Sequence, residues 1–391
     1  YFNEYKQSEF SRLIKAVLFF RFFIILIIVY LLSELDIINF KLFFISASIF
    51  PLLISADVIF QYIFGFNIVG MKSYIHHNTS FFGDELIAGG YIQNFSFFSI
   101  FLTIFLLKNK NTFRFGVTTI LICIFATSIL FSGNRMATIL FLFGLVLTFF
   151  FNNKLRIIIP LSLICIFISS IFLSDAAIKN RYHSMYDHYV VGEIVPRLEI
   201  LIPSGVISKL PTLQSFFKKN SEINKEAAKG IEETSSFVNQ TGEKGLIFTA
   251  IDTWSRNKIF GNGMKSFRVT CQINQQYILT ETTNFSKKLR QCSNHPHNYY
   301  FEILTETGII GLSVVLIIAL FFVIFIFKNL KVFKGNNIEH FFILAAVITL
   351  ILELFPLKTS GSVFTTNDAA YIVLVSSIIL SHKKVLKGKN L

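Results

Sequence analysis

Long apolar runs separated by short polar segments dominate this chain, and they recur from Leu13 almost to the carboxyl end. A helix of about 20 residues crosses the hydrocarbon core of a bilayer, which is about 30 Å thick. The pattern therefore predicts an all-α, polytopic membrane protein with about nine spanning helices. The expected ranges are 13–32, 39–60, 86–107, 116–132, 136–151, 157–174, 308–327, 339–356 and 368–381.

One long polar stretch, residues 175–307, interrupts the apolar runs between the sixth and seventh expected spans. It holds most of the acidic residues and the only tryptophan, Trp254. We interpret it as an extramembrane loop domain. It divides the chain into N-terminal transmembrane helices (1–174), the loop domain, and C-terminal transmembrane helices with a cytoplasmic tail (308–391).

Lysine and arginine in short loops mark the cytoplasmic side of a membrane protein. Four basic clusters fall on one side if the predicted helix count is right: 108–114, 154–156, 328–334 and 383–389. This orientation places four segments outside: 61–85, 132–135, 175–307 and 357–367.

Three cations disagree with this orientation, because Arg12, Lys15 and Arg21 flank or enter the first span on its outer side. Either that helix is misassigned or these cations face lipid phosphate. The chain also starts at Tyr1 without an initiator methionine, so we expect leading helices to be missing.

Composition supports the membrane assignment. Hydrophobic residues make up 53% and charged residues 15% of the 391 residues, which is too apolar for an ordinary soluble enzyme. The net charge of +13 comes from clusters between apolar runs. Such clusters indicate topology, so we expect membrane lipids and no nucleic acid as partners.

The sharpest chemical motif begins at His295-Pro296-His297-Asn298, where the long loop meets the seventh span. A neutral histidine at a membrane surface can accept a proton from a hydroxyl near pH 7. Asn298 and Glu302 share a helical face and can orient a sugar or the imidazole. Gly308 and Gly311 follow, and such small residues permit close helix packing.

Two other interpretations of this motif remain. His297 can be an interfacial histidine that caps a helix. Alternatively Cys292, His295 and His297 have the ligand types of a zinc site.

A second motif, Ser132-Gly133-Asn134-Arg135-Met136-Ala137, stands between the fourth and fifth spans. The planar guanidinium of Arg135 suits bidentate binding of a diphosphate. The alternative is a helix end with a snorkelling arginine.

Together these motifs resemble the signatures of the O-antigen ligase and polymerase superfamily. His297-Asn298, nine residues, Gly308, two residues and Gly311 match its His-Asn-x9-Gly-x-x-Gly pattern, and 132–137 resembles its Ser-Gly-x-Arg-x-Ala element. Residues 83–90 look like the family's outer loop, and 259–268 look like its Gly-x-Gly segment. Family members usually have about twelve spans, so the resemblance implies that three leading helices are missing.

The resemblance implies a fold similar to C-type glycosyltransferases, with a mostly helical periplasmic cap, in the bacterial inner membrane. The donor would be a glycan on polyprenyl (undecaprenyl) diphosphate, and the acceptor lipid A core or another glycan. His297 would act as general base. Arg135, with Arg268 or Arg181, would stabilise the leaving diphosphate, and the inverting reaction would need no metal or other cofactor. Arg268 can instead pair with a loop acid such as Asp252.

We favour a ligase. The alternatives are an O-antigen polymerase or a protein O-oligosaccharyltransferase, which differ in the acceptor. A more distant alternative is a transporter or flippase in which intramembrane Asp57 and Glu353 couple transport. We expect Asp57 to be structural and Glu353 to contact substrate or a buried cation.

Cys271 and Cys292 both lie in the long loop, whose predicted periplasmic location is oxidising. A disulfide between them would fix the segment just before His297. The alternative is two free thiols.

Overall fold

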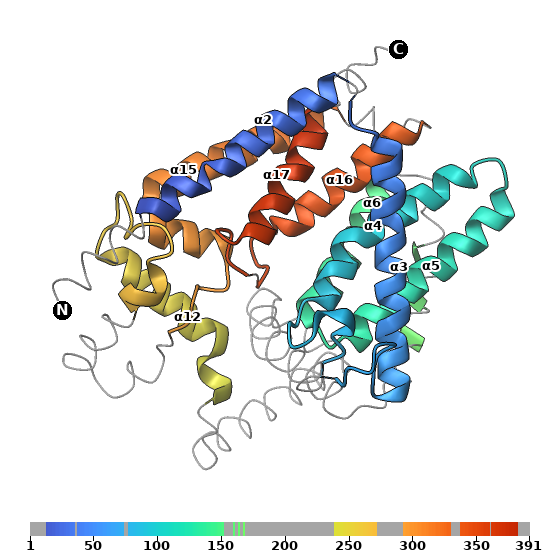
Figure 1. The fold of residues 1–391 in the computed structure, drawn as a ribbon, viewed down its shortest axis with the longest axis horizontal. Helices are drawn as coiled ribbons and strands as arrows, with labels where there is room; N and C mark the ends of the chain where they lie inside the picture. Colours follow the sequence, from blue (N-terminus) through green and yellow to red (C-terminus); the bar gives the residue numbers. More distant parts are fainter. Residues whose placement is uncertain are drawn as a thin grey trace, which may run out of the picture.

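The computed structural model describes residues 13–35, 37–73, 77–151, 238–271, 292–329, 337–359 and 361–381, with short pieces at 159–160, 163–164 and 167–168. In these ranges the chain is helical and contains no strand (Figure 1). The elements are α2 (Arg21–Glu34), α3 (Phe40–Phe64), the short 3₁₀ helix η1 (Ser80–Phe82), α4 (Ala88–Leu106), α5 (Asn111–Phe131), α6 (Arg135–Phe151), α12 (Val238–Ser255), α15 (Tyr299–Lys328), α16 (Ile338–Glu353) and α17 (Thr366–Ser381).

Five helices in the described ranges are long and apolar enough to cross a membrane: Leu13–Glu34, Phe40–Phe64, Ala88–Leu106, Thr112–Phe131 and Tyr299–Lys328. Two apolar helices are shorter, Arg135–Phe150 and Thr366–Ser381. Helices thus occupy every predicted range except 157–174, most of which lies outside the described residues. The helical fold is confirmed for the described residues and is consistent with a membrane protein, whereas the count of nine spans stays a prediction.

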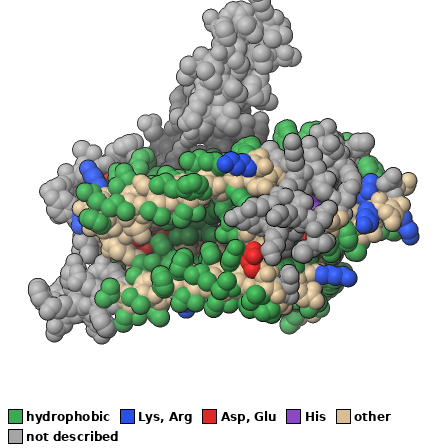
Figure 2. All heavy atoms as spheres, turned by 90° about the horizontal axis from the view of Figure 1, so that it is seen from above, with side chains coloured by type: hydrophobic (Ala, Val, Ile, Leu, Met, Phe, Trp, Pro, Cys, Tyr) green, Lys and Arg blue, Asp and Glu red, His purple; other side chains and the backbone are tan. Residues whose placement is uncertain are grey.

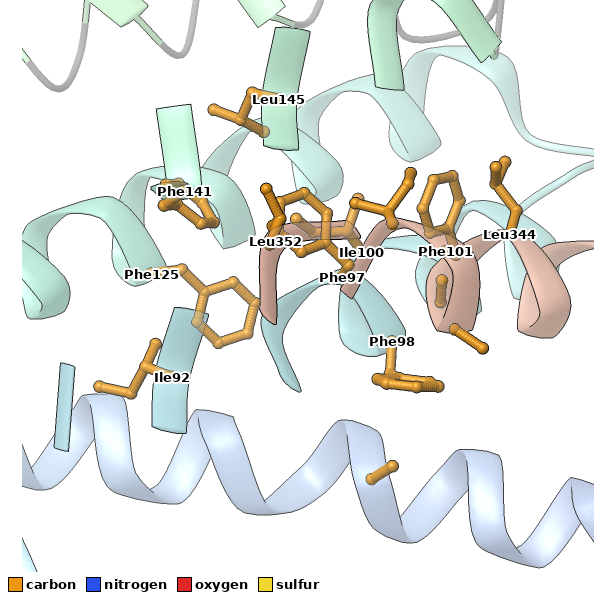
Figure 3. Packing of buried hydrophobic residues seen from close by; sticks show 14 of the residues in the cluster. Ile92, Phe97, Phe98, Ile100, Phe101, Phe125, Phe141, Leu145, Leu344 and Leu352 are labelled. Atoms are coloured by element: carbon orange, nitrogen blue, oxygen red, sulfur yellow. The ribbon is translucent and has the colours of Figure 1, made fainter. Parts of the chain in front are cut away.

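The core forms around α4, which packs against α3, α5 and α16. Phe97, Phe98 and Phe101 of α4 have almost no exposed surface, and Figure 3 shows them among side chains from α5, α6 and α16. Helix α16 is buried along nearly its whole length, from Phe341 to Leu350. A helix that is apolar on all faces is stable only when it is surrounded in this way by other helices or lipid.

The opposite situation holds for α2 and the second half of α15. Helix α2 packs against α17, and α15 packs against α12, but large apolar side chains of α15 such as Ile318, Leu320 and Phe321 remain exposed. Hydrophobic side chains cover much of the face shown in Figure 2. Exposed apolar surface of this extent fits contact with lipid.

The helices alternate in direction, so their ends gather at two opposite ends of the bundle. We call one the His297 end: α3, α5 and α16 end there, and α4, α6, α15 and α17 begin there. Arg21 also belongs to it, because its guanidinium donates to Thr366 Oγ1 at 2.9 Å. The first helix is therefore present as predicted, and Arg21 contacts the start of α17. Lys108, Arg114 and Lys328 lie at the opposite end, close to the end of α4, the start of α5 and the end of α15.

Candidate functional site

A disulfide fixes the segment that leads to His297. Cys292 is bonded to Cys271, with 5.8 Å between their Cα atoms, and Cys271 is fully buried. The predicted bridge is thus confirmed in the structure. A disulfide sulfur cannot serve as the thiolate ligand that zinc requires, so the zinc alternative loses its only cysteine ligand.

His297 stands five residues after Cys292 and two residues before the start of α15, and it is partly exposed. Its Nε2 lies 3.4 Å from Ser293 Oγ, and its ring centroid lies 4.3 Å from that of His295. The backbone of His297 has φ +55°, a left-handed conformation that is uncommon outside glycine. Such a conformation persists only where neighbouring contacts hold it.

Asn298 makes some of these neighbouring contacts. It is the N-cap of α15, and its Oδ1 accepts hydrogen bonds from the backbone N–H groups of Tyr300 and Phe301. Its Nδ2 donates to the carbonyl oxygen of Pro356 at 2.7 Å. The amide therefore joins the start of α15 to the turn after α16, and a contact of Asn298 with substrate stays a prediction.

Glu302 also has chain partners for both carboxylate oxygens. It is 2% exposed; Oε1 accepts from Ser362 Oγ, and Oε2 accepts from the backbone N–H of Val363 at 2.8 Å. The carboxylate thus holds the loop before α17 against α15. This geometry gives Glu302 a positioning role, and its predicted contact with substrate stays untested.

Gly308 breaks α15 into two helices at the residue where the seventh span was predicted to begin. It has φ +69° and ψ −169°, a conformation open almost only to glycine. The segment 258–263 lies against the break. Its backbone donates to the carbonyls of Thr305 and Glu306 at 2.9 Å, and the carbonyl of Lys258 accepts from Ile309 N–H at 2.9 Å.

These hydrogen bonds pair backbone carbonyl and N–H groups that the break in α15 would otherwise leave without partners. The sequence pattern assigned Gly308 and Gly311 to helix packing; at Gly308 the close neighbour is a loop and not a helix, whereas for Gly311 the interpretation stays a prediction. Gly308 admits the loop backbone of Ile259 and Gly261, and a Cβ on Gly311 would meet the Thr307 side chain of its own helix.

Arg268 follows this segment, in a short helical stretch that begins at Phe267. Glu306 is buried, and its carboxylate accepts a hydrogen bond from the backbone N–H of Lys265. The exposed guanidinium of Arg268 lies within electrostatic reach of this carboxylate. Arg268 is thus at the His297 end, close to the break in α15, and its predicted contact with a diphosphate stays a prediction.

The Arg135 motif is a tight turn between α5 and α6. Ser132 Oγ donates to the carbonyl of Ile129 at 2.7 Å, and Asn134 Oδ1 accepts from Ala137 N–H at 3.2 Å, as an N-cap does. Arg135 itself is exposed, and we find no hydrogen-bond or ion-pair partner for its guanidinium among the residues that the structure describes. A cation at a helix N-terminus is unfavourable to the helix dipole, so folding gives no reason for an arginine here.

A small hollow adjoins this turn. His77 and Asn78 line it together with Ser132 and Asn134. His77 Nδ1 lies 3.0 Å from the carbonyl oxygen of Ser132, and Asn78 Nδ2 donates to the carbonyl of Phe131 at 2.7 Å. Sequence reasoning missed both residues, although an adjacent histidine and asparagine in a predicted outer loop offered a signal.

Arg135 and His297 lie at the same end of the bundle, and no bond between their side chains is found in the described ranges. A contact between Phe143 and Phe355, with ring centroids 5.2 Å apart, links α6 to the turn that Asn298 holds. Arg135 precedes Phe143 by two helical turns, or about 12 Å. The two predicted catalytic residues therefore lie on different helices at the His297 end, and their contact with one substrate stays a prediction.

A family model described as O-antigen ligase matches residues 119–316. The match covers half of the chain and includes both the Arg135 motif and the His297 motif. The chain belongs to the O-antigen ligase family. Searches of curated proteins and of solved structures found no match. Membership in the O-antigen ligase family supports glycan transfer of the ligase or polymerase type, with a lipid-linked glycan and an acceptor as partners.

Two buried acids outside the O-antigen ligase motifs also have partners. Glu353, which is 2% exposed, pairs with the Lys358 ammonium at 2.6 Å, so the predicted contact with a cation is confirmed. Asp57 accepts from Ile68 N–H and from Ser80 Oγ, which confirms its structural role. Arg181, the remaining predicted arginine, lies outside the described residues.

Proposed function

We propose that this protein transfers a glycan from polyprenyl (undecaprenyl) diphosphate to an acceptor hydroxyl at the periplasmic face of a bacterial inner membrane. Lipid A core is the acceptor we favour, which makes the protein an O-antigen ligase. One observation carries the proposal: Arg135 and His297, distant in sequence and both inside the family match, lie at one end of the bundle.

The charge distribution supports the periplasmic assignment of this end. Lys108, Lys110 and Arg114 lie at the opposite end, around the turn between α4 and α5. Short-loop lysine and arginine stay in the cytoplasm, so the His297 end would face the periplasm. The overall arrangement would be that of C-type glycosyltransferases, with about nine spans and residues 175–307 as the cap.

In the proposed reaction, the acceptor hydroxyl attacks the anomeric carbon of the donor sugar. A new carbon–oxygen bond forms on one face while the bond to the diphosphate oxygen breaks on the other, which inverts the anomeric centre. His297 takes the hydroxyl proton, and the diphosphate leaves with the bonding electrons. The partly exposed imidazole of His297 is accessible for this role.

Arg135 would bind the diphosphate and stabilise the negative charge that it gains as the bond breaks. Its guanidinium is exposed and lacks an acidic partner in the described part of the chain, so its positive charge remains available. Arg268, which lies close to the break in α15, would assist, and Arg181 is a further candidate. No metal ion or other cofactor enters the proposed reaction.

The structure gives less support to a transporter or flippase. That alternative needs Asp57 and Glu353 to bind a coupling ion. Asp57 of α3 instead accepts two hydrogen bonds from the segment that follows this helix, and Glu353 accepts from Lys358, Asn94 and Tyr299. Coupling would require these bonds to break.

The test is glycan transfer in proteoliposomes that contain a polyprenyl diphosphate glycan and lipid A core, with EDTA present. We expect transfer by the wild-type protein and a loss of at least about a hundredfold in His297→Ala, because a general base contributes a factor of that size. His295→Ala is the matched control, since its ring lies beside His297. Equal activity of His297→Ala and the wild type would refute the assigned base, and inhibition by EDTA would refute the metal-free reaction.

The acceptor is decided in the same vesicles. Lipid A core, a second repeat unit and a peptide are offered in turn with one donor. Preferred transfer to lipid A core supports the ligase. Preferred transfer to the repeat unit supports a polymerase, and preferred transfer to the peptide supports a protein O-oligosaccharyltransferase.

A further inference from the structure

A buried ion pair between Glu353 and Lys358 lies at the C-terminal end of α16, at the His297 end of the bundle. The Glu353 carboxylate accepts hydrogen bonds from Lys358 Nζ at 2.6 Å, from Tyr299 Oη at 2.7 Å and from Asn94 Nδ2 at 2.9 Å. Asp368 of α17 also interacts with the Tyr299 hydroxyl and with Lys358. The Lys358 ammonium thus faces two carboxylates, and its side chain is only 15% exposed.

The turn between Glu353 and Lys358 is bonded to each of the three residues that follow His297. Asn298 Nδ2 donates to Pro356 O at 2.7 Å, Tyr299 Oη donates to Glu353, and Tyr300 Oη donates to Leu354 O at 2.6 Å. Of these three hydrogen bonds, only the one from Tyr299 has a charged acceptor, the Glu353 carboxylate. Hydrogen bonds to charged groups are stronger than those between neutral groups.

His297 needs such support because its backbone is in the left-handed region, at φ +55°. That conformation is held from one side by the disulfide at Cys292 and from the other by the start of α15. The charge pair lies outside the matched family region, which ends at residue 316. Its position beside the His297 motif arises from the fold of this chain.

We propose that Lys358 is a positioning residue, which keeps Glu353 as a charged acceptor for Tyr299 and thereby holds His297 at the acceptor hydroxyl. This inference rests on the proposed function. Without Lys358 the carboxylate stays buried beside Asp368 without a cation, so it takes up a proton or admits water. Either change weakens its bond to Tyr299 and frees the start of α15 to shift.

The experiment compares full-length wild type, Lys358→Met, Lys358→Arg and Tyr299→Phe in proteoliposomes. Lys110→Met, an exposed lysine at the opposite end, is the matched control, and His297→Ala gives the background. We expect kcat to fall about tenfold in Lys358→Met and Tyr299→Phe while the donor KM stays within about twofold, as for a group that acts on the base and not on donor binding. Lys358→Arg should recover most of kcat.

Glu353→Gln combined with Lys358→Met adds a second check. Neutralising both partners removes the unpaired buried charge, so the double variant should exceed Lys358→Met in kcat. A rise in donor KM at constant kcat would show that Lys358 binds the donor and would overturn the positioning role. Wild-type kcat in either Lys358→Met or Tyr299→Phe would also overturn it.

A measurement that does not depend on glycan transfer separates this inference from the proposed function. Diethyl pyrocarbonate modifies accessible histidines, and mass spectrometry of the peptide with His295 and His297 reports the rate. We expect faster modification of His297 in Lys358→Met than in the wild type or Lys358→Arg. Equal rates refute the positioning role, whereas a wild type that transfers no glycan refutes only the proposed function.

Discussion

Gly261 and Gly308 lie backbone against backbone at the break in α15. A Cβ on Gly261 would stand 2.5 Å from Gly308 N, and a Cβ on Gly308 would stand 2.6 Å from Gly261 N. Both residues also have positive φ. The family glycine in the His-Asn-x9-Gly-x-x-Gly pattern therefore serves to insert a loop between two half-helices, and this contact connects the Arg268 segment to the His297 segment.

Gly308→Ala should severely destabilise the protein. The new Cβ meets backbone atoms that cannot move independently, and the backbone conformation itself is strained for alanine, so we expect a cost above about 2 kcal/mol. The measurement is the melting temperature and the yield of monodisperse protein. Gly116→Ala is the control, because a Cβ there meets nothing and alanine favours a helix interior. A normal melting temperature for Gly308→Ala would contradict the described contact.

Arg135→Ala should reduce glycan transfer without reducing stability. The guanidinium is exposed and unpaired among the described residues, so its loss should change the free energy of unfolding by less than about 0.5 kcal/mol. Asn134→Ala provides the contrast, because loss of the N-cap should cost about 1 kcal/mol. Thermal unfolding and donor kinetics, measured on both variants, check the prediction. Full activity of Arg135→Ala would exclude it from the site.

Reduction of the Cys271–Cys292 bridge should lower stability and transfer together. The two cysteines are 21 residues apart, and closing a loop of that size stabilises a fold by about 3 kcal/mol. Ser replacement of both cysteines, or dithiothreitol on the wild type, should lower the melting temperature. Cys123→Ser is the control, because Cys123 lies outside the bridge. If dithiothreitol alters neither melting nor transfer, the bridge does not hold the His297 segment.

The apolar pattern predicted the helices well because membrane burial leaves a strong signal at every position. Helix ends were less accurate: the seventh span was expected at 308, whereas α15 begins at Tyr299 and is interrupted at Gly308. The first half of α15 carries polar residues that lie outside an apolar run. Hydropathy alone therefore assigned residues 299–307 to the long loop and not to the helix.

The motifs identified the candidate site but not the partners of its residues. Asn298 and Glu302 were expected to contact substrate, yet in the structure they bond to the segment between α16 and α17. Lys358 was not singled out, because its pairing with Glu353 across the turn at Pro356 depends on the end of α16. An acid at the end of an apolar run with a lysine five residues on offered a weak signal for this pair.

Glu302→Gln distinguishes a positioning residue from a substrate contact. The amide keeps one acceptor but places an NH₂ group against one of its two donors, Ser362 Oγ or Val363 N–H. A buried donor left without an acceptor costs about 1–3 kcal/mol, so the melting temperature should fall. Ser362→Ala, which removes one of the same bonds, should lower it less. In the protein that remains folded, the KM values for donor and acceptor should stay unchanged in both variants. A raised KM in Glu302→Gln but not in Ser362→Ala would show that the carboxylate binds substrate directly, as the sequence pattern suggested.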